Sequence, residues 1–109
     1  MELRSTGPIY SLLVEEHALE QLDAFVIELG ERIDWIQEAE QVGQLEEAAK
    51  RANELAAKAR TMGLPPLAEA AERVAANGRE GDAAATHTAI VELTNVVTRV
   101  RLGHRGGLG

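Results

Sequence analysis

Apolar residues recur at intervals of three and four along most of this chain, the spacing of one face of an α-helix. Gly30 interrupts the first such stretch, and glycine inside a helix costs about 1 kcal/mol relative to alanine. The pattern predicts either a kinked helix or two helices meeting end to end, over about 18–29 and 31–42, ended by Gly43. The apolar positions of the stretch are Leu19, Leu22, Phe25, Val26, Leu29, Ile33 and Ile36.

The middle of the chain predicts a pair of helices. The range 44–62 carries an alanine-rich apolar stripe that lets a neighbouring helix approach closely, and Gly63 stands where a glycine commonly ends a helix. Two prolines then stop that helix and pre-set the first turn of the next one. The second helix of the pair covers about 66–76 and is expected to end at Asn77, which precedes a glycine.

Asp82 is a good N-cap residue, and a last helix of about 83–102 follows it. Residues 1–9 are predicted to be a lead-in, 10–102 a single helical bundle, and the glycine-rich 103–109 a flexible tail. Short loops make successive helices antiparallel. The predicted architecture is therefore all-α: an up-down four-helix bundle with a short extra N-terminal helix or helix extension.

Composition narrows the function. A formal charge of −7 argues against a nucleic-acid partner, because phosphates require a basic surface. No apolar run approaches the roughly 18 residues of a membrane span, and no signal peptide is visible, so we expect no membrane partner and a cytoplasmic location. Cysteine is absent, and so are the phosphate-loop, nucleophile-elbow and zinc-protease motifs. We therefore expect a binding protein that is not an enzyme and uses no cofactor.

The chain's three histidines are candidates for chemistry. His17 and Glu20 have the i, i+3 spacing of a metal-binding helix, but the second copy that a di-iron bundle needs is missing. His87 lies near the edge of the last apolar stripe and is expected to be a boundary residue, and His104 falls in the predicted tail. No metal site is predicted.

Charge is distributed unevenly along the chain. The range 15–47 is strongly acidic, whereas 50–60 contains four basic residues and the single acid Glu54. Such a patch is commonly no more than a solvated helix face, but it also suits an acidic protein partner. The basic residues are Lys50, Arg51, Lys58 and Arg60.

The same helix carries a family resemblance. Residues 52–67 read Ala-Asn-Glu-Leu-Ala-Ala-Lys-Ala-Arg-Thr-Met-Gly-Leu-Pro-Pro-Leu. This segment resembles the core of histidine-containing phosphotransfer (HPt) domains, which reads Ala-His-any-Leu-Lys-Gly, then small residues, a helix-ending glycine and a leucine. The range 74–82 looks like the family's link into its last helix, and the likeness covers roughly 8–102. The resemblance implies a four-helix bundle and a role in a two-component phosphorelay.

The chain differs from the family at the positions that carry out phosphoryl transfer. Asn53 stands at the position of the phosphoryl-accepting histidine, Ala56 at that of the lysine, and Ala57 at that of the glycine, whereas Leu55 and Gly63 are retained. The resemblance therefore implies a degenerate HPt domain that binds a receiver domain or a histidine kinase without carrying phosphate. The partner-binding residues it implies are Lys50, Arg51, Asn53, Glu54, Ala57, Lys58 and Arg60.

Two alternatives remain open at this level. One is an active phosphotransfer protein that uses another histidine, His17 or His87. The other is a helical interaction or structural module outside phosphorelay, self-associating as a homodimer, with Trp35 as its best interface anchor.

Overall fold

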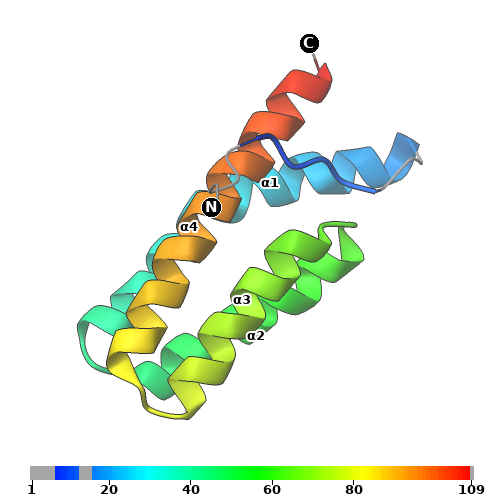
Figure 1. Cartoon of the computed structure of the whole chain (residues 1–109). Coiled ribbons are helices and arrows are strands. Elements are labelled where there is room, and N and C mark those ends of the chain that lie inside the picture. Colours follow the sequence, from blue (N-terminus) through cyan, green and yellow to red (C-terminus); the bar gives the residue numbers. More distant parts are fainter. Residues whose placement is uncertain (1–6, 13–15, 109) are drawn as a thin grey trace.

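Four α-helices account for most of the described chain, which comprises residues 7–12 and 16–108 of a computed structural model, with side chains described for 7–12 and 18–104. They are α1 (Glu16–Gln41), α2 (Leu45–Thr61), α3 (Pro65–Arg79) and α4 (Ala83–Leu108), and these ranges contain no strand. Successive helices run in opposite directions (Figure 1). The predicted all-α four-helix bundle is confirmed. Within the described ranges no helix combines the length and apolar character needed to cross a membrane.

The three turns between helices share one construction, in which a glycine adopts a positive φ. In the α2–α3 turn Gly63 has a φ of 70°, and its N–H donates to the Arg60 carbonyl oxygen at 3.1 Å. The next N–H, of Leu64, donates to the Ala59 carbonyl oxygen at 2.9 Å. This pair of hydrogen bonds satisfies carbonyl groups that the last helical turn leaves unpaired. Gly43 and Gly81 do the same after α1 and α3.

α1 is continuous through Gly30, so the stretches expected as 18–29 and 31–42 form one helix. A Cβ at Gly30 would have Arg101 Nη1 as its nearest neighbour, at 3.9 Å, so packing does not require glycine there. The apolar stripe faces the bundle as predicted, except at Leu19, which is 44% exposed. Burial of the stripe on both sides of Gly30 outweighs one unfavourable residue, since tertiary packing supplies most helix stability.

α3 continues past Asn77, where the sequence predicted its end, and stops at Arg79. Gly78 is buried against α2: a Cβ there would lie 2.7 Å from the Leu45 carbonyl oxygen and 3.0 Å from Ala49 Cβ. Gly78, which the sequence pattern marked as the end of the helix, therefore permits a close approach of two helices. The glycine that ends α3 is the next one, Gly81.

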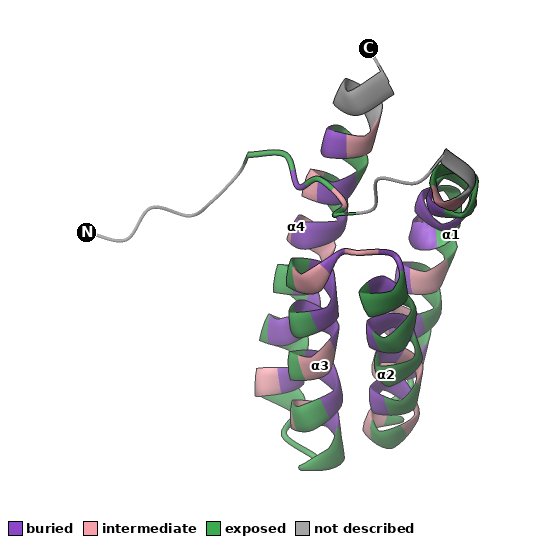
Figure 2. Ribbon diagram, turned by 90° about the vertical axis from the view of Figure 1, so that its right-hand side faces the viewer, coloured by how far each residue is buried: buried purple, intermediate pink, exposed green. Residues whose placement is uncertain are grey.

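Alanine fills the space between α2 and α3, the most closely packed pair of helices. The buried residues line the facing sides of the helices in Figure 2, and α1 and α4 pack together less closely. Small side chains bring helix axes close, which explains why the bundle is tight on one side. The buried alanines of α2 and α3 are Ala48, Ala49, Ala52, Ala56, Ala59, Ala68, Ala70, Ala71 and Ala75.

Residues 7–12, here called the N-terminal strap, cross one end of the bundle without forming a helix (Figure 1). The Ile9 N–H donates to the Arg99 carbonyl oxygen on α4 at 2.9 Å, and the Leu12 N–H donates to the Gly63 carbonyl oxygen at 2.8 Å. The strap thereby links α4 to the α2–α3 turn.

α4 does not end at Leu102, because it continues to Leu108 through residues that the sequence assigned to a tail. Gly103 is buried beneath the strap, and a Cβ there would overlap the carbonyl oxygen of Ile9. Glycine at this position allows the strap backbone to lie against the helix, a long-range reason that the local composition does not reveal.

Candidate protein-binding surface

α2 presents Asn53 to solvent. The exposed residues around it recur at intervals of three and four, so they share one face of the helix, here called the Asn53 surface. Among the described residues no hydrogen bond engages the Asn53 carboxamide, which leaves its two N–H donors and its oxygen available to a partner. The members of the surface are Lys50, Asn53, Glu54, Ala57 and Lys58.

Two neighbours of Asn53 in the sequence are buried rather than exposed. Leu55 is 1% exposed and Ala56 is 2% exposed, so both belong to the core. The position where the resemblance places a lysine is therefore directed into the bundle in this chain. Ala57, where the resemblance places a glycine, is exposed and leaves a shallow surface one turn beyond Asn53.

Arg51, one of the predicted partner-binding residues, is engaged within the bundle. Its Nε donates to Glu47 Oε2 at 3.0 Å, and its Nη1 donates to the Trp35 carbonyl oxygen on α1 at 2.7 Å. The guanidinium carbon also lies 4.3 Å from the centroid of the Trp35 ring, a cation–π contact. Arg51 therefore joins α2 to α1, and only 18% of its side chain is exposed.

Arg60 is likewise paired within the chain. Both Nε and Nη2 donate to Glu72 Oε2 on α3, the former at 3.1 Å. These hydrogen bonds and the negative charge of Glu72 raise the pKa of Arg60 above its ordinary value. The pair is exposed, so solvent screens the attraction between its charges. Arg60 lies at the edge of the Asn53 surface, and Glu72 already neutralises part of its charge.

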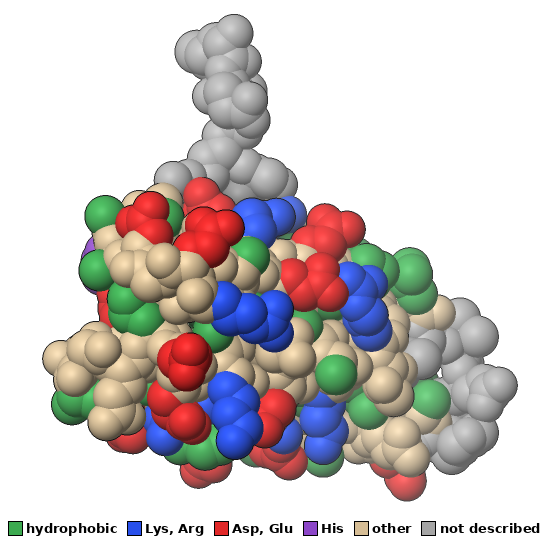
Figure 3. All heavy atoms as spheres, turned by 90° about the horizontal axis from the view of Figure 1, so that it is seen from below, with side chains coloured by type: hydrophobic (Ala, Val, Ile, Leu, Met, Phe, Trp, Pro, Cys, Tyr) green, Lys and Arg blue, Asp and Glu red, His purple; other side chains and the backbone are tan. Residues whose placement is uncertain are grey.

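The basic patch predicted from the sequence thus contains fewer unpaired basic side chains in the folded structure than the sequence suggested. Lys50 and Lys58 remain on the Asn53 surface, and within the described residues neither forms an ion pair. Figure 3 shows basic and acidic side chains interspersed over the face seen from below. The Asn53 surface is therefore mildly positive rather than strongly basic, since its two lysines flank one glutamate.

Arg51→Ala should lower the free energy of unfolding by about 1–2 kcal/mol, because it removes a cation–π contact, an i, i+4 ion pair and the hydrogen bond to the Trp35 carbonyl oxygen. Urea unfolding followed by the fluorescence of Trp35, the chain's one tryptophan, measures this loss. Lys50→Ala, on the same helix but exposed, is the control and should change the unfolding free energy by less than about 0.5 kcal/mol. Equal stability of Arg51→Ala and the wild type would show that the Arg51 contacts contribute nothing.

The two histidines whose side chains are described both pair with carboxylates of α1. His87 Nδ1 lies 2.8 Å from Glu40 Oε2, and His104 Nε2 lies 2.9 Å from Asp23 Oδ1. These pairs connect α4 to α1, the two helices that pack less closely. The His17 side chain lies outside the described residues. Among the described residues no three metal-ligating side chains come together.

Trp35 is 43% exposed, with one face of its ring against Arg51. It lies above a shallow depression of about 530 Å³ that is rimmed by four acidic residues of α1 and by Arg32. An interface anchor at Trp35 requires an exposed side chain, and Trp35 is exposed, but Arg51, which covers one face of the ring, belongs to another helix and could not be predicted from local spacing.

Comparison of this chain with protein-family models, with curated proteins and with solved structures finds no match. The resemblance to HPt domains over 52–67 therefore stays a prediction that depends on the order of its residues.

Proposed function

We propose that this chain is a degenerate HPt domain that binds the phosphorylation face of a receiver domain through the Asn53 surface and does not accept a phosphoryl group. The observation that supports this proposal is the solvent-exposed carboxamide of Asn53 on α2, at the position where the resemblance places a histidine. The four-helix bundle is the architecture that the resemblance implies.

Phosphoryl transfer requires a nucleophilic imidazole nitrogen at this position. The amide nitrogen of asparagine has its lone pair delocalised into the carbonyl group, so Asn53 does not attack a phosphoaspartate. Its N–H groups do donate hydrogen bonds to carboxylates such as those that line a receiver's phosphorylation pocket. We therefore propose that the chain binds the receiver's phosphorylation pocket but does not accept its phosphoryl group.

The surroundings of Asn53 suit contact with an acidic pocket. Ala57 presents only a methyl group one turn away, so a partner's backbone can approach closely. Lys50 and Lys58 stand on either side along the helix and attract an acidic partner through their unpaired charges. Among the described residues these two lysines form no ion pair, whereas Arg60 at the edge of the surface is paired with Glu72.

The alternative of a self-associating module anchored by Trp35 has less support. A frequent interface anchor is an aromatic side chain that fills a partner's pocket. One face of the Trp35 ring is already covered by Arg51, and Trp35 lines a depression together with four acidic residues of α1. Two copies meeting there would oppose like charges.

Two substitutions on the Asn53 surface test the proposal. Asn53→Arg places a long side chain where the partner's pocket should close, and Ala57→Glu places a negative charge against the acidic pocket, so each should weaken binding to a receiver at least about tenfold. Thr88→Arg, an equally exposed site on α4, is the matched control and should leave binding unchanged. The measurement is isothermal titration against a panel of purified receiver domains with beryllofluoride at the phosphorylation site. The proposal fails if no receiver binds, or if all three variants bind like the wild type.

A further inference from the structure

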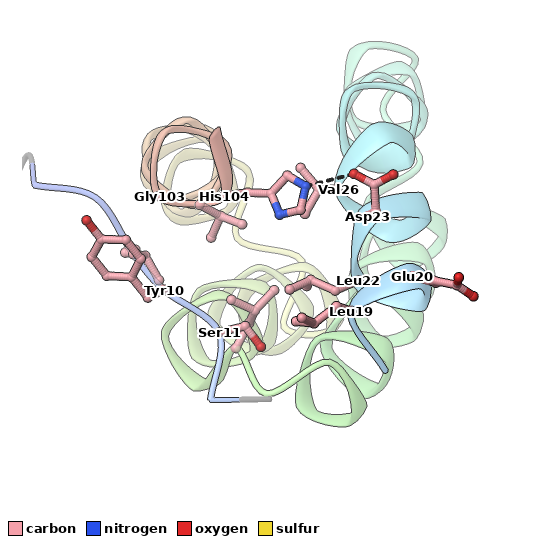
Figure 4. A pocket seen from close by; sticks show the side chains of 12 residues that line it. Tyr10, Ser11, Leu19, Glu20, Leu22, Asp23, Val26, Gly103 and His104 are labelled. Atoms are coloured by element: carbon pink, nitrogen blue, oxygen red, sulfur yellow. Dashed lines mark hydrogen bonds and ion pairs between the residues drawn. The ribbon is translucent and has the colours of Figure 1, made fainter. Parts of the chain in front are cut away.

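A cavity of about 510 Å³ opens at the end of the bundle, between the N-terminal strap, α1 and α4 (Figure 4). Its size lies within the range of about 300–1,000 Å³ that is typical of small-molecule sites. Leu19 is 44% exposed there, so the wall leaves apolar surface in contact with water, which favours an apolar ligand. The apolar side chains that line the cavity are Ile9, Leu19, Leu22, Val26, Leu64 and Val100.

The strap forms one wall of this cavity and is fixed in place. The Ser11 hydroxyl donates to the Met62 carbonyl oxygen at 2.6 Å, and Arg99 Nε donates to the Gly7 carbonyl oxygen at 2.8 Å. These hydrogen bonds add to those of the Ile9 and Leu12 backbone. The wall is therefore preformed, so less conformational entropy is lost when a ligand binds.

His104 supplies a polar atom in this apolar setting. Its Nε2 lies 2.9 Å from Asp23 Oδ1, and an ionised carboxylate only accepts hydrogen bonds, so Nε2 is the donor in this pair. In the tautomer whose proton is on Nε2, the second ring nitrogen keeps its lone pair. In Figure 4 the other ring nitrogen, Nδ1, points toward the space enclosed by the strap, Leu22 and Gly103. Among the described residues Nδ1 has no hydrogen-bond partner, so its lone pair is available as an acceptor.

We propose that this cavity binds a small amphipathic molecule with a hydroxyl group, an alkylphenol or a comparable alcohol. Its hydrocarbon part lies against Leu19, Leu22 and Val26, and its hydroxyl group donates a hydrogen bond to His104 Nδ1. The charged groups that line the cavity do not favour a charged ligand. Asp23 is committed to His104, and the Glu20 side chain points away from the cavity in Figure 4. The site is separate from the Asn53 surface and does not rest on the proposed function.

Two probes separate the apolar contribution from the hydrogen bond: 4-propylphenol, and propylbenzene, which lacks the hydroxyl group. Each is titrated into the full chain and followed by backbone amide NMR shifts. Both should shift amides of the strap, the first half of α1 and the end of α4. His104→Phe keeps the ring and removes the acceptor, so it should lower the preference for 4-propylphenol over propylbenzene about fivefold, the usual net value of one neutral hydrogen bond.

Leu19→Trp fills the cavity from a partly exposed position and should abolish binding of both probes. Ile27→Trp is its matched control, since Ile27 is 73% exposed on the same helix and lies outside the cavity. It should bind both probes as the wild type does. The proposal is overturned if the shifts map elsewhere, if Leu19→Trp binds normally, or if His104→Phe leaves the preference between the probes unchanged.

Discussion

Gly78→Ala should destabilise the bundle by about 2 kcal/mol, although alanine is the better helix former. The added Cβ would lie 2.7 Å from the backbone carbonyl oxygen of Leu45 and 3.0 Å from Ala49 Cβ, so α2 and α3 must move apart. Overpacking costs up to about 3 kcal/mol, and the gain in helix propensity returns about 1 kcal/mol. A backbone atom, unlike a flexible side chain, cannot turn away from the new methyl group.

Gly30→Ala is the matched control for this prediction. Gly30 is also inside a helix, but its Cβ would meet nothing closer than Arg101 Nη1 at 3.9 Å. This substitution should therefore raise the free energy of unfolding by about 0.5–1 kcal/mol. Urea unfolding followed by circular dichroism measures both variants. Two shifts of the same sign would contradict the close α2–α3 packing at Gly78.

Asn53→His should give at most a trace of phosphate acceptance, because no cation stands at the position where the resemblance places the lysine that neutralises the phosphoryl group. The position that the resemblance gives to lysine is occupied by Ala56, which is 2% exposed, and a lysine there would bring its charge into the core. Ala57 is exposed one turn after Asn53, on the same face. The double variant Asn53→His/Ala57→Lys should accept phosphate about tenfold faster than Asn53→His, as one charge-assisted hydrogen bond suggests.

The measurement for this pair of variants is acid-labile phosphate after incubation with a phosphorylated receiver domain that binds the wild type. Ala57→Lys alone is the control and should carry no label, since it adds a cation and no nucleophile. A double variant that folds, binds the receiver and still carries no label would show that position 53 does not face the phosphoryl group. Both variants replace exposed residues, so loss of folding is not expected.

The sequence was sufficient to predict the helices, because their stripes are long and regular. Asp82 was predicted to cap the last helix, and its Oδ1 accepts a hydrogen bond from the Ala85 N–H at 3.0 Å. The predicted helix ends were wrong where a glycine allows segments that are distant in the sequence to pack closely. Gly78 and Gly103 were interpreted as signs of an end and of a tail, but each allows another backbone to approach, and local composition contains no information on that neighbour.

The candidate surface shows the same limit. Helical periodicity accounts for the exposure of Asn53, because Ala52 and Leu55 are buried and lie about 100° and 200° round the helix from it. The basic patch, however, was predicted from the charges of residues that are close in the sequence. That prediction did not include the interhelical partners of Arg51 and Arg60, which lie on α1 and α3. Electrostatics at a surface depends on such partners, so within the described residues only Lys50 and Lys58 of the patch are left without an ion pair.

The most direct measurement combines binding and transfer on the wild-type chain. A receiver domain that binds it is phosphorylated with labelled phosphate and incubated with the chain, and complex formation and acid-labile label are measured on the same sample. We predict a complex in which the label stays on the receiver or is lost to water. Acid-labile phosphate on His17, His87 or His104 would contradict it, because the chain would then be a working phosphotransfer protein.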